Sequence, residues 1–270
     1  MKITKFILAF VFVSCFFSCS SDDSNGTDDG DNAGDFILTL NDGSFWTYNI
    51  ESEDSNTRDS IYISNDTIIN GRTYKKFKVE NDIATGFYSS SLRNNGVRLL
   101  DGKLLLSGDL SLAGGADLGL DFDVTLDDFI IFNRNAASGQ LLSTKSGIIE
   151  EDFDGTPITI NYSLKSFGGE TLTSFTSPNG DSYENIKSVL IKLNVTVTTI
   201  QEVFGFPVVI TVLAPQDVIV STQYIASGIG VVHTNTDTTY SINTTIADQF
   251  GIPASGSQNQ KEYLDDYQIN

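Results

Sequence analysis

Residues 189–199 read VLIKLNVTVTT, and this stretch decides the fold of the chain. Apolar and polar side chains alternate, and successive side chains of a strand point to opposite faces of its sheet. The apolar positions, which we expect in a core, are Val189, Ile191, Leu193, Val195 and Val197. The polar positions, which we expect to face water or a lumen, are Lys192, Asn194, Thr196 and Thr198. The stretch therefore predicts a long strand with one buried face.

Two further apolar runs follow, at 207–213 and 218–225. The breaks between the three runs contain Gly or Pro, at 204–207 and 214–217, which is typical of an antiparallel meander. Upstream, Asn70-Gly71 is a strong hairpin signal because both residues tolerate a positive φ. The same reasoning predicts strands at 87–93 and 97–100 around Asn94-Asn95-Gly96. A single helical turn is expected at 247–250.

Composition supports one all-β domain. The chain has 270 residues, of which 40% are hydrophobic, so it can build a core. Its formal net charge of −19 repels phosphate backbones, so nucleic acid is excluded as an expected partner. We expect an antiparallel meander that forms an open barrel or a sandwich.

The N-terminal sequence is typical of an export signal. A basic start precedes an apolar run at 6–17, which is too short to span a bilayer. Phe16-Phe17-Ser18-Cys19 resembles a bacterial lipobox, so we expect residues 1–18 to be a signal peptide and Cys19 to carry the lipid. The alternative is an ordinary signal peptide whose two Cys are accidental. Residues 19–35 are rich in Asp, Gly, Ser and Asn and predict a flexible acidic tether, which leaves 36–270 as the domain.

Four segments resemble uncharacterised flavobacterial (Bacteroidetes) cell-envelope lipoproteins. They are 43–48 with 66–74, then Tyr224 to Val232, then Leu264 to Ile269. At fold level only, such proteins are similar to open β-barrels that carry lipoproteins or lipids across the periplasm. The acidic Ser20-Ser21-Asp22-Asp23 resembles a surface-export signal, although an acidic linker without a sorting role is nearly as good an interpretation. The resemblance implies a lipid-anchored outer-membrane protein, with the cell surface slightly favoured, and assigns no site residue.

One stretch could hold a metal ion. Asp121, Asp123 and Asp127 would line one face of a strand, and Ca²⁺ binds clustered carboxylates. A straight strand spreads its ligands, however, so a solvated acidic edge that blocks aggregation is the favoured interpretation. No other cofactor is expected. Three tripeptides also resemble an Asp-Ser/Thr-apolar O-glycosylation motif of the same envelope, with acceptors at Ser60, Thr67 and Thr238.

Catalytic signals are weak. His233 is the single His of the chain, and we expect it at the surface near a strand end. Beyond Cys19 the sequence has no Cys, and it lacks the motifs of common hydrolases, metalloproteases and nucleotide-binding enzymes. The expected function is therefore non-catalytic: a monomer that binds an apolar ligand or another envelope component. A structural or adhesive module is the alternative, and an acid-pair glycan hydrolase is the least favoured. An apolar cavity lined from both 45–50 and 189–197 favours the first.

Overall fold

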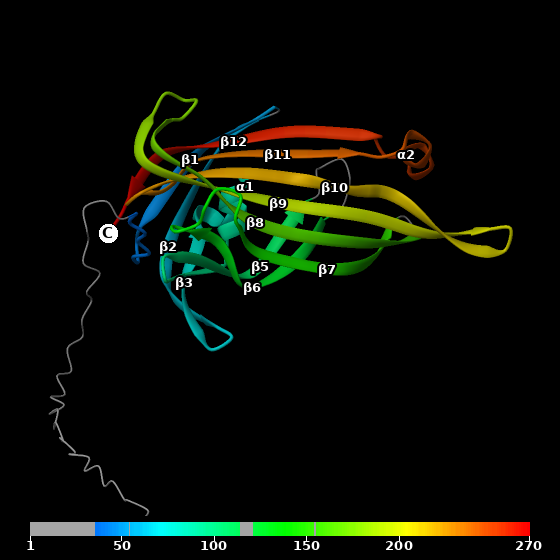
Figure 1. Ribbon diagram of the computed structural model, residues 1–270, viewed down its shortest axis with the longest axis horizontal. Helices are drawn as coiled ribbons and strands as arrows, with labels where there is room; N and C mark the ends of the chain where they lie inside the picture. Colours follow the sequence, from blue (N-terminus) through cyan, green and yellow to red (C-terminus); the bar gives the residue numbers. More distant parts are fainter. Residues whose placement is uncertain (1–35, 54, 114–120, 154) are drawn as a thin grey trace, which may run out of the picture. The chain divides into compact units, whose positions relative to one another are not determined.

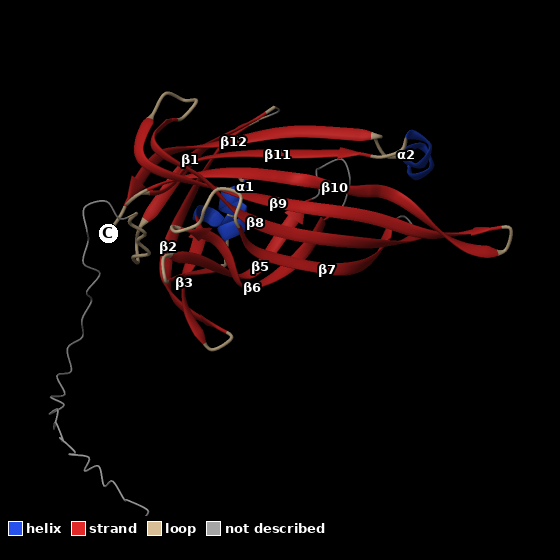
Figure 2. Ribbon diagram, in the orientation of Figure 1, coloured by secondary structure: helices blue, strands red, loops and turns tan. Residues whose placement is uncertain are grey.

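The computed structural model describes residues 36–53, 55–113, 121–153 and 155–270 (Figures 1 and 2). Within these ranges most residues lie in strands. The elements in chain order are β1 (Phe45–Ser52), β2 (Asn56–Ile69), β3 (Arg72–Val79), a 3-10 turn (Glu80–Asp82), α1 (Phe87–Leu92), β4 (Gly96–Leu100), β5 (Lys103–Ala113), β6 (Asp121–Asn133), β7 (Leu141–Phe153), β8 (Thr156–Thr176), β9 (Ser182–Val203), β10 (Phe206–Ala226), β11 (Gly230–Ser241), α2 (Thr244–Phe250) and β12 (Ser255–Gln268).

All the strands belong to one antiparallel sheet, in the order β6-β5-β4-β3-β2-β1-β12-β11-β10-β9-β8-β7. The first and last strands of the chain pair with each other, so the meander curls into a nearly closed barrel. One seam stays unsealed, because β6 and β7 form the two edges and share no ladder in the described residues. The Ser166 hydroxyl of β8 bridges the seam by donating to the Ile130 carbonyl of β6 at 2.5 Å. The all-β meander is thus confirmed, as a barrel.

The predicted alternation of buried and outward-facing residues is confirmed in β9. All five of its predicted core residues are buried, Leu193 completely. They point into the barrel, while the four polar residues between them are half-buried on its outer face. The adjoining prediction of a break at 214–217 is wrong, since β10 runs through it with register shifts against β9. Because β11 pairs with β10 only from Ile219 onward, Pro215 lies where β10 has a single neighbour, and a missing N–H is tolerated there.

The strand predicted at 87–93 is also wrong: residues 87–92 form α1, which lies inside the barrel (Figure 1). The N–H groups of its first turn are bound by side chains of distant strands. Asp59 of β2 accepts from the N–H of Gly86 at 2.8 Å. From β12, Gln260 accepts from Phe87 N–H and Glu262 from Tyr88 N–H, each at 2.7 Å. A helix start normally needs such acceptors nearby in sequence, and here the barrel supplies them.

The β9–β10 hairpin projects beyond the rest of the barrel (Figure 1). Its ladder with β8 ends at Thr199, so residues 200–209 form a two-stranded ribbon. The ribbon is apolar yet exposed, and Phe204 at its tip is 97% exposed. Phe204 has a φ of 53°, a left-handed conformation that is rare for a bulky side chain. Among the described residues, no helix has both the length and the apolar character needed to cross a membrane.

Candidate ligand-binding site

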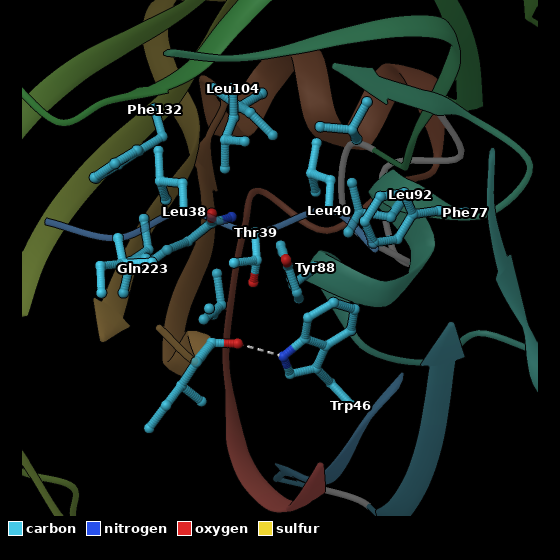
Figure 3. Close-up of a pocket in the computed structure, with 17 residues that line it drawn as sticks. Leu38, Thr39, Leu40, Trp46, Phe77, Tyr88, Leu92, Leu104, Phe132 and Gln223 are labelled. Atoms are coloured by element: carbon cyan, nitrogen blue, oxygen red, sulfur yellow. Dashed lines mark hydrogen bonds between the residues drawn. The ribbon is translucent and has the colours of Figure 1, made fainter. Parts of the chain in front are cut away.

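A cavity of about 50 Å³ lies inside one end of the barrel (Figure 3). Its lining comes from β1, β3, β4, β5, β6, β10, β11, α1 and the segment before β1. The side chains are almost all apolar, and none of them is charged: Ile37, Leu38, Thr39, Leu40, Trp46, Phe77, Tyr88, Leu92, Val97, Leu104, Ile131, Phe132, Gln223, Ile225, Ile229, Gly230 and Val231. Such a space, apolar with a few polar groups, is typical of sites for small apolar ligands.

Residues 36–40, called the strap below, close this end of the cavity. Phe36 packs against Phe132 with ring centroids 5.4 Å apart. The Ile37 N–H donates to the Ser227 hydroxyl at 2.8 Å, and the Ile37 carbonyl accepts from Gly228 at 3.1 Å. The next three strap residues make no hydrogen bonds with the described part of the chain and contribute side chains to the cavity wall. The strap is therefore held at one end and mainly by apolar contact.

Trp46 forms the floor opposite the strap. Its ring stacks on Phe77, with centroids 6.2 Å apart. Its indole N–H donates to the Ile229 carbonyl at 2.6 Å, the dashed line of Figure 3. Gly230 follows with a φ of 113°, and a Cβ there would lie 3.1 Å from the indole nitrogen. Glycine thus lets the β10–β11 turn approach the ring closely enough to fix it.

A second cavity of about 20 Å³ adjoins the first. The two share four wall residues: Tyr88, Leu92, Ile131 and Gln223. The first cavity reaches β1 through Trp46, and the second reaches β9 through Ile191. Apolar interior space is therefore lined from both predicted strands, but as two small cavities that a few side chains separate.

A row of polar side chains crosses the inner wall beside these cavities. Gln223 of β10 is paired in register with Thr234 of β11, which is paired in turn with Glu262 of β12. All three residues are buried. The Thr234 hydroxyl and Glu262 Oε2 have no hydrogen-bond partner in the described structure. Burial, with a contribution from the Asp59 charge, raises the pKa of Glu262 to about 8, which favours the protonated carboxyl at pH 7.

His233 is not at the surface, so that prediction is wrong. It lies within β11, is only 3% exposed, and stacks on Tyr263 with centroids 5.0 Å apart. Phe175, near the end of β8, and Tyr224 of β10 stack on it as well. Its Nδ1 lies 2.8 Å from the Glu262 carbonyl oxygen, and burial lowers its pKa. Three aromatic rings from separate strands cover the imidazole, which adjacency in sequence could not reveal.

The acidic stripe falls on the edge strand β6. Asp123 and Asp127 are exposed, whereas the side chain of Asp121 lies outside the described residues. Asp123 accepts from the Ser111 hydroxyl at 2.5 Å, and Asp127 pairs with Arg72 at 3.2 Å. The described part of the chain holds no group of three or more potential metal ligands. The calcium site stays a prediction.

The remaining sequence-based sites are dispersed. Ser60 and Thr67 lie on β2 and Thr238 on β11, each half-buried, so glycosylation stays a prediction. Cys19 lies outside the described residues.

No family model, curated protein or solved structure matches the chain. The resemblance to envelope lipoproteins therefore also stays a prediction.

Proposed function

We propose that this chain is a non-catalytic, lipid-anchored cell-envelope protein whose barrel binds an apolar ligand. The observation that supports the proposal most directly is the uncharged cavity beneath the strap. Burial of apolar surface drives binding, and a wall without charges imposes no cost of desolvating an ion. The unsealed seam between β6 and β7 adds a place where the wall can widen, because no ladder must be broken there.

The cavity is too small for a ligand unless something moves. An engineered cavity of about 150 Å³ binds benzene, so about 50 Å³ leaves room for less than one aromatic ring. Leu38 and Leu40 line the cavity from the strap, and neither makes a hydrogen bond with the described part of the chain. We therefore assign the strap as the part that a ligand displaces.

Binding of N-phenyl-1-naphthylamine, an uncharged apolar fluorophore, tests the proposal with the full chain. We expect saturable binding to the wild type. The double variant Leu38→Ala/Leu40→Ala should bind the fluorophore roughly tenfold more tightly, because it enlarges the cavity and weakens the strap. Val97→Phe should weaken the affinity for the fluorophore by roughly tenfold or more, because the phenyl ring fills the cavity.

Val208→Phe is the matched control, since it makes the same change on the exposed hairpin. It should leave the affinity unchanged. Circular dichroism must show that Val97→Phe is folded before its result is read. If the wild type does not bind the fluorophore, or if both cavity variants bind it like the wild type, the barrel is not its binding site.

The anchor has its own test. Cys19→Ala should abolish metabolic labelling with a fatty-acid analogue and release the protein from the membrane fraction. Cys15→Ala should do neither, because Cys15 lies within the apolar run of the signal. A Cys19→Ala protein that still pellets with membranes would contradict lipidation at this residue.

A second candidate function is docking to another envelope component, and the β9–β10 hairpin favours it. Ile200, Phe204, Phe206 and Val209 are all more than half exposed on this ribbon. Exposed apolar groups that cluster on a projecting element are typical of interaction surfaces. Docking through this ribbon requires no ligand in the cavity. A wild type that does not bind the fluorophore would therefore favour docking over ligand binding.

A further inference from the structure

The side chain of Gln223 is unusual for the interior of an apolar cavity. Gln223 is only 4% exposed, and it borders both cavities. Figure 3 shows its amide directed into the space between the strap and α1. The amide makes no hydrogen bond with any side chain or backbone group in the described part of the chain. A buried amide normally has partners for its carbonyl and its NH₂ group.

Tyr88 is a second polar group of the same kind. Its ring borders both cavities, and its hydroxyl has no hydrogen-bond partner in the described part of the chain. At the next positions of the same row, the Thr234 hydroxyl and Glu262 Oε2 also have no hydrogen-bond partner among the described residues. Folded proteins leave few polar groups without partners, and two that border the same cavities, the Gln223 amide and the Tyr88 hydroxyl, indicate an occupant that carries hydrogen-bonding atoms.

We infer that the ligand carries one uncharged hydrogen-bonding group, a hydroxyl or a carbonyl, which is bound by the Gln223 amide and the Tyr88 hydroxyl. This inference rests on the proposed function and names the chemical class of its ligand. The amide can donate to a carbonyl or accept from a hydroxyl, and the phenol can do the same. The rest of the ligand is apolar, like the remaining wall.

The lack of cationic side chains in the cavity wall disfavours the binding of fatty-acid anions and phosphate head groups at this position. None of the lining residues is Lys, Arg or His. A buried anion without a cationic partner is strongly disfavoured, and the neighbouring carboxyl of Glu262 would oppose it further once ionised. An alcohol, ketone, ester or amide satisfies the same polar atoms without that penalty.

Competition against N-phenyl-1-naphthylamine on the full chain tests the inference. The competitors are decan-1-ol, decanoate and 1-chlorodecane, which share one chain length and differ at the end group. In the wild type we expect decan-1-ol to compete about tenfold better than either of the others, the effect of one buried hydrogen bond. Gln223→Leu, which is close in size, should remove most of the preference for decan-1-ol over 1-chlorodecane, and Tyr88→Phe should remove part of it.

Thr222→Val is the matched control, because it removes a hydroxyl from the neighbouring outward position of β10. It should keep the full preference. Failure of the fluorophore to bind the wild type would overturn the proposed function itself. Fluorophore binding with equal competition by the three compounds, with decanoate as the best competitor, or with an unchanged preference in Gln223→Leu would overturn only the inference about the ligand. Ordered water as the sole occupant predicts equal competition.

Discussion

Leu193→Ala is expected to lower the free energy of unfolding by about 2–5 kcal/mol. Leu193 is completely buried in the central part of β9 and points into the barrel core. Truncation removes its burial energy and leaves a cavity, and domains of this size are stable by only about 5–15 kcal/mol. Urea denaturation followed by circular dichroism measures the loss.

Thr196→Val is the matched control on the same strand. Thr196 lies on the outer face of β9, and valine keeps its β-branched shape, so we expect a change below about 0.5 kcal/mol. Asn194 would be a poorer control, because its amide donates to Asp217 at 2.9 Å. Similar losses for Leu193→Ala and Thr196→Val would mean that the two faces of β9 are not inside and outside.

Glu262→Gln is expected to stabilise the protein at alkaline pH. The ordinary pKa of 4.5 is raised to about 8 in the folded protein. Between these values the folded protein keeps a proton that the unfolded chain has lost, so rising pH favours unfolding. This contribution to stability is fully present below about pH 4.5 and is lost by about pH 8. Glutamine keeps the acceptor for Tyr88 N–H and does not titrate.

The difference in unfolding free energy between Glu262→Gln and wild type is the quantity to measure. It should grow from near zero at pH 4.5 to roughly 2–5 kcal/mol at pH 9. Both proteins contain His233, whose lowered pKa destabilises the folded state at acidic pH, so its contribution cancels in the difference between them. Glu202→Gln on the exposed hairpin removes one carboxylate without burial and serves as the control. A difference that does not vary with pH would show that Glu262 titrates normally in the folded protein.

The local sequence pattern was sufficient to predict which residues face the core in strands with one apolar and one polar face. In β9 every inward residue from 189 to 197 is apolar, so the register could be read from sequence. In β10 it could not, because Ser221 and Gln223 point inward beside Ile219 and Ile225. A polar residue in an alternating strand is normally assigned to the solvent-exposed face, so sequence alone did not identify Gln223 as part of the proposed binding site.

The helix α1 was missed for a different physical reason. The residues FYSSSL carry no local capping signal, since the acceptors for the first turn are Asp59, Gln260 and Glu262. These side chains become neighbours only when β2 and β12 are both in the barrel. The cavity wall depends on the same assembly, because Tyr88 and Leu92 of α1 border both cavities. A short window of sequence around α1 does not include these acceptors, so it could not predict the helix.

The pairing of β1 with β12 determines how the barrel must fold. Most strands can form hairpins with the next strand as the chain emerges, but β1 has only one neighbour until the last strand arrives. Closing a ring between Phe45 and Gln268 restricts nearly the whole domain at once, and contacts of such long range slow folding. Until that step, the edge of β1 that β12 will cover is open to wrong partners. The period before β12 is available is therefore when the chain most needs protection against aggregation.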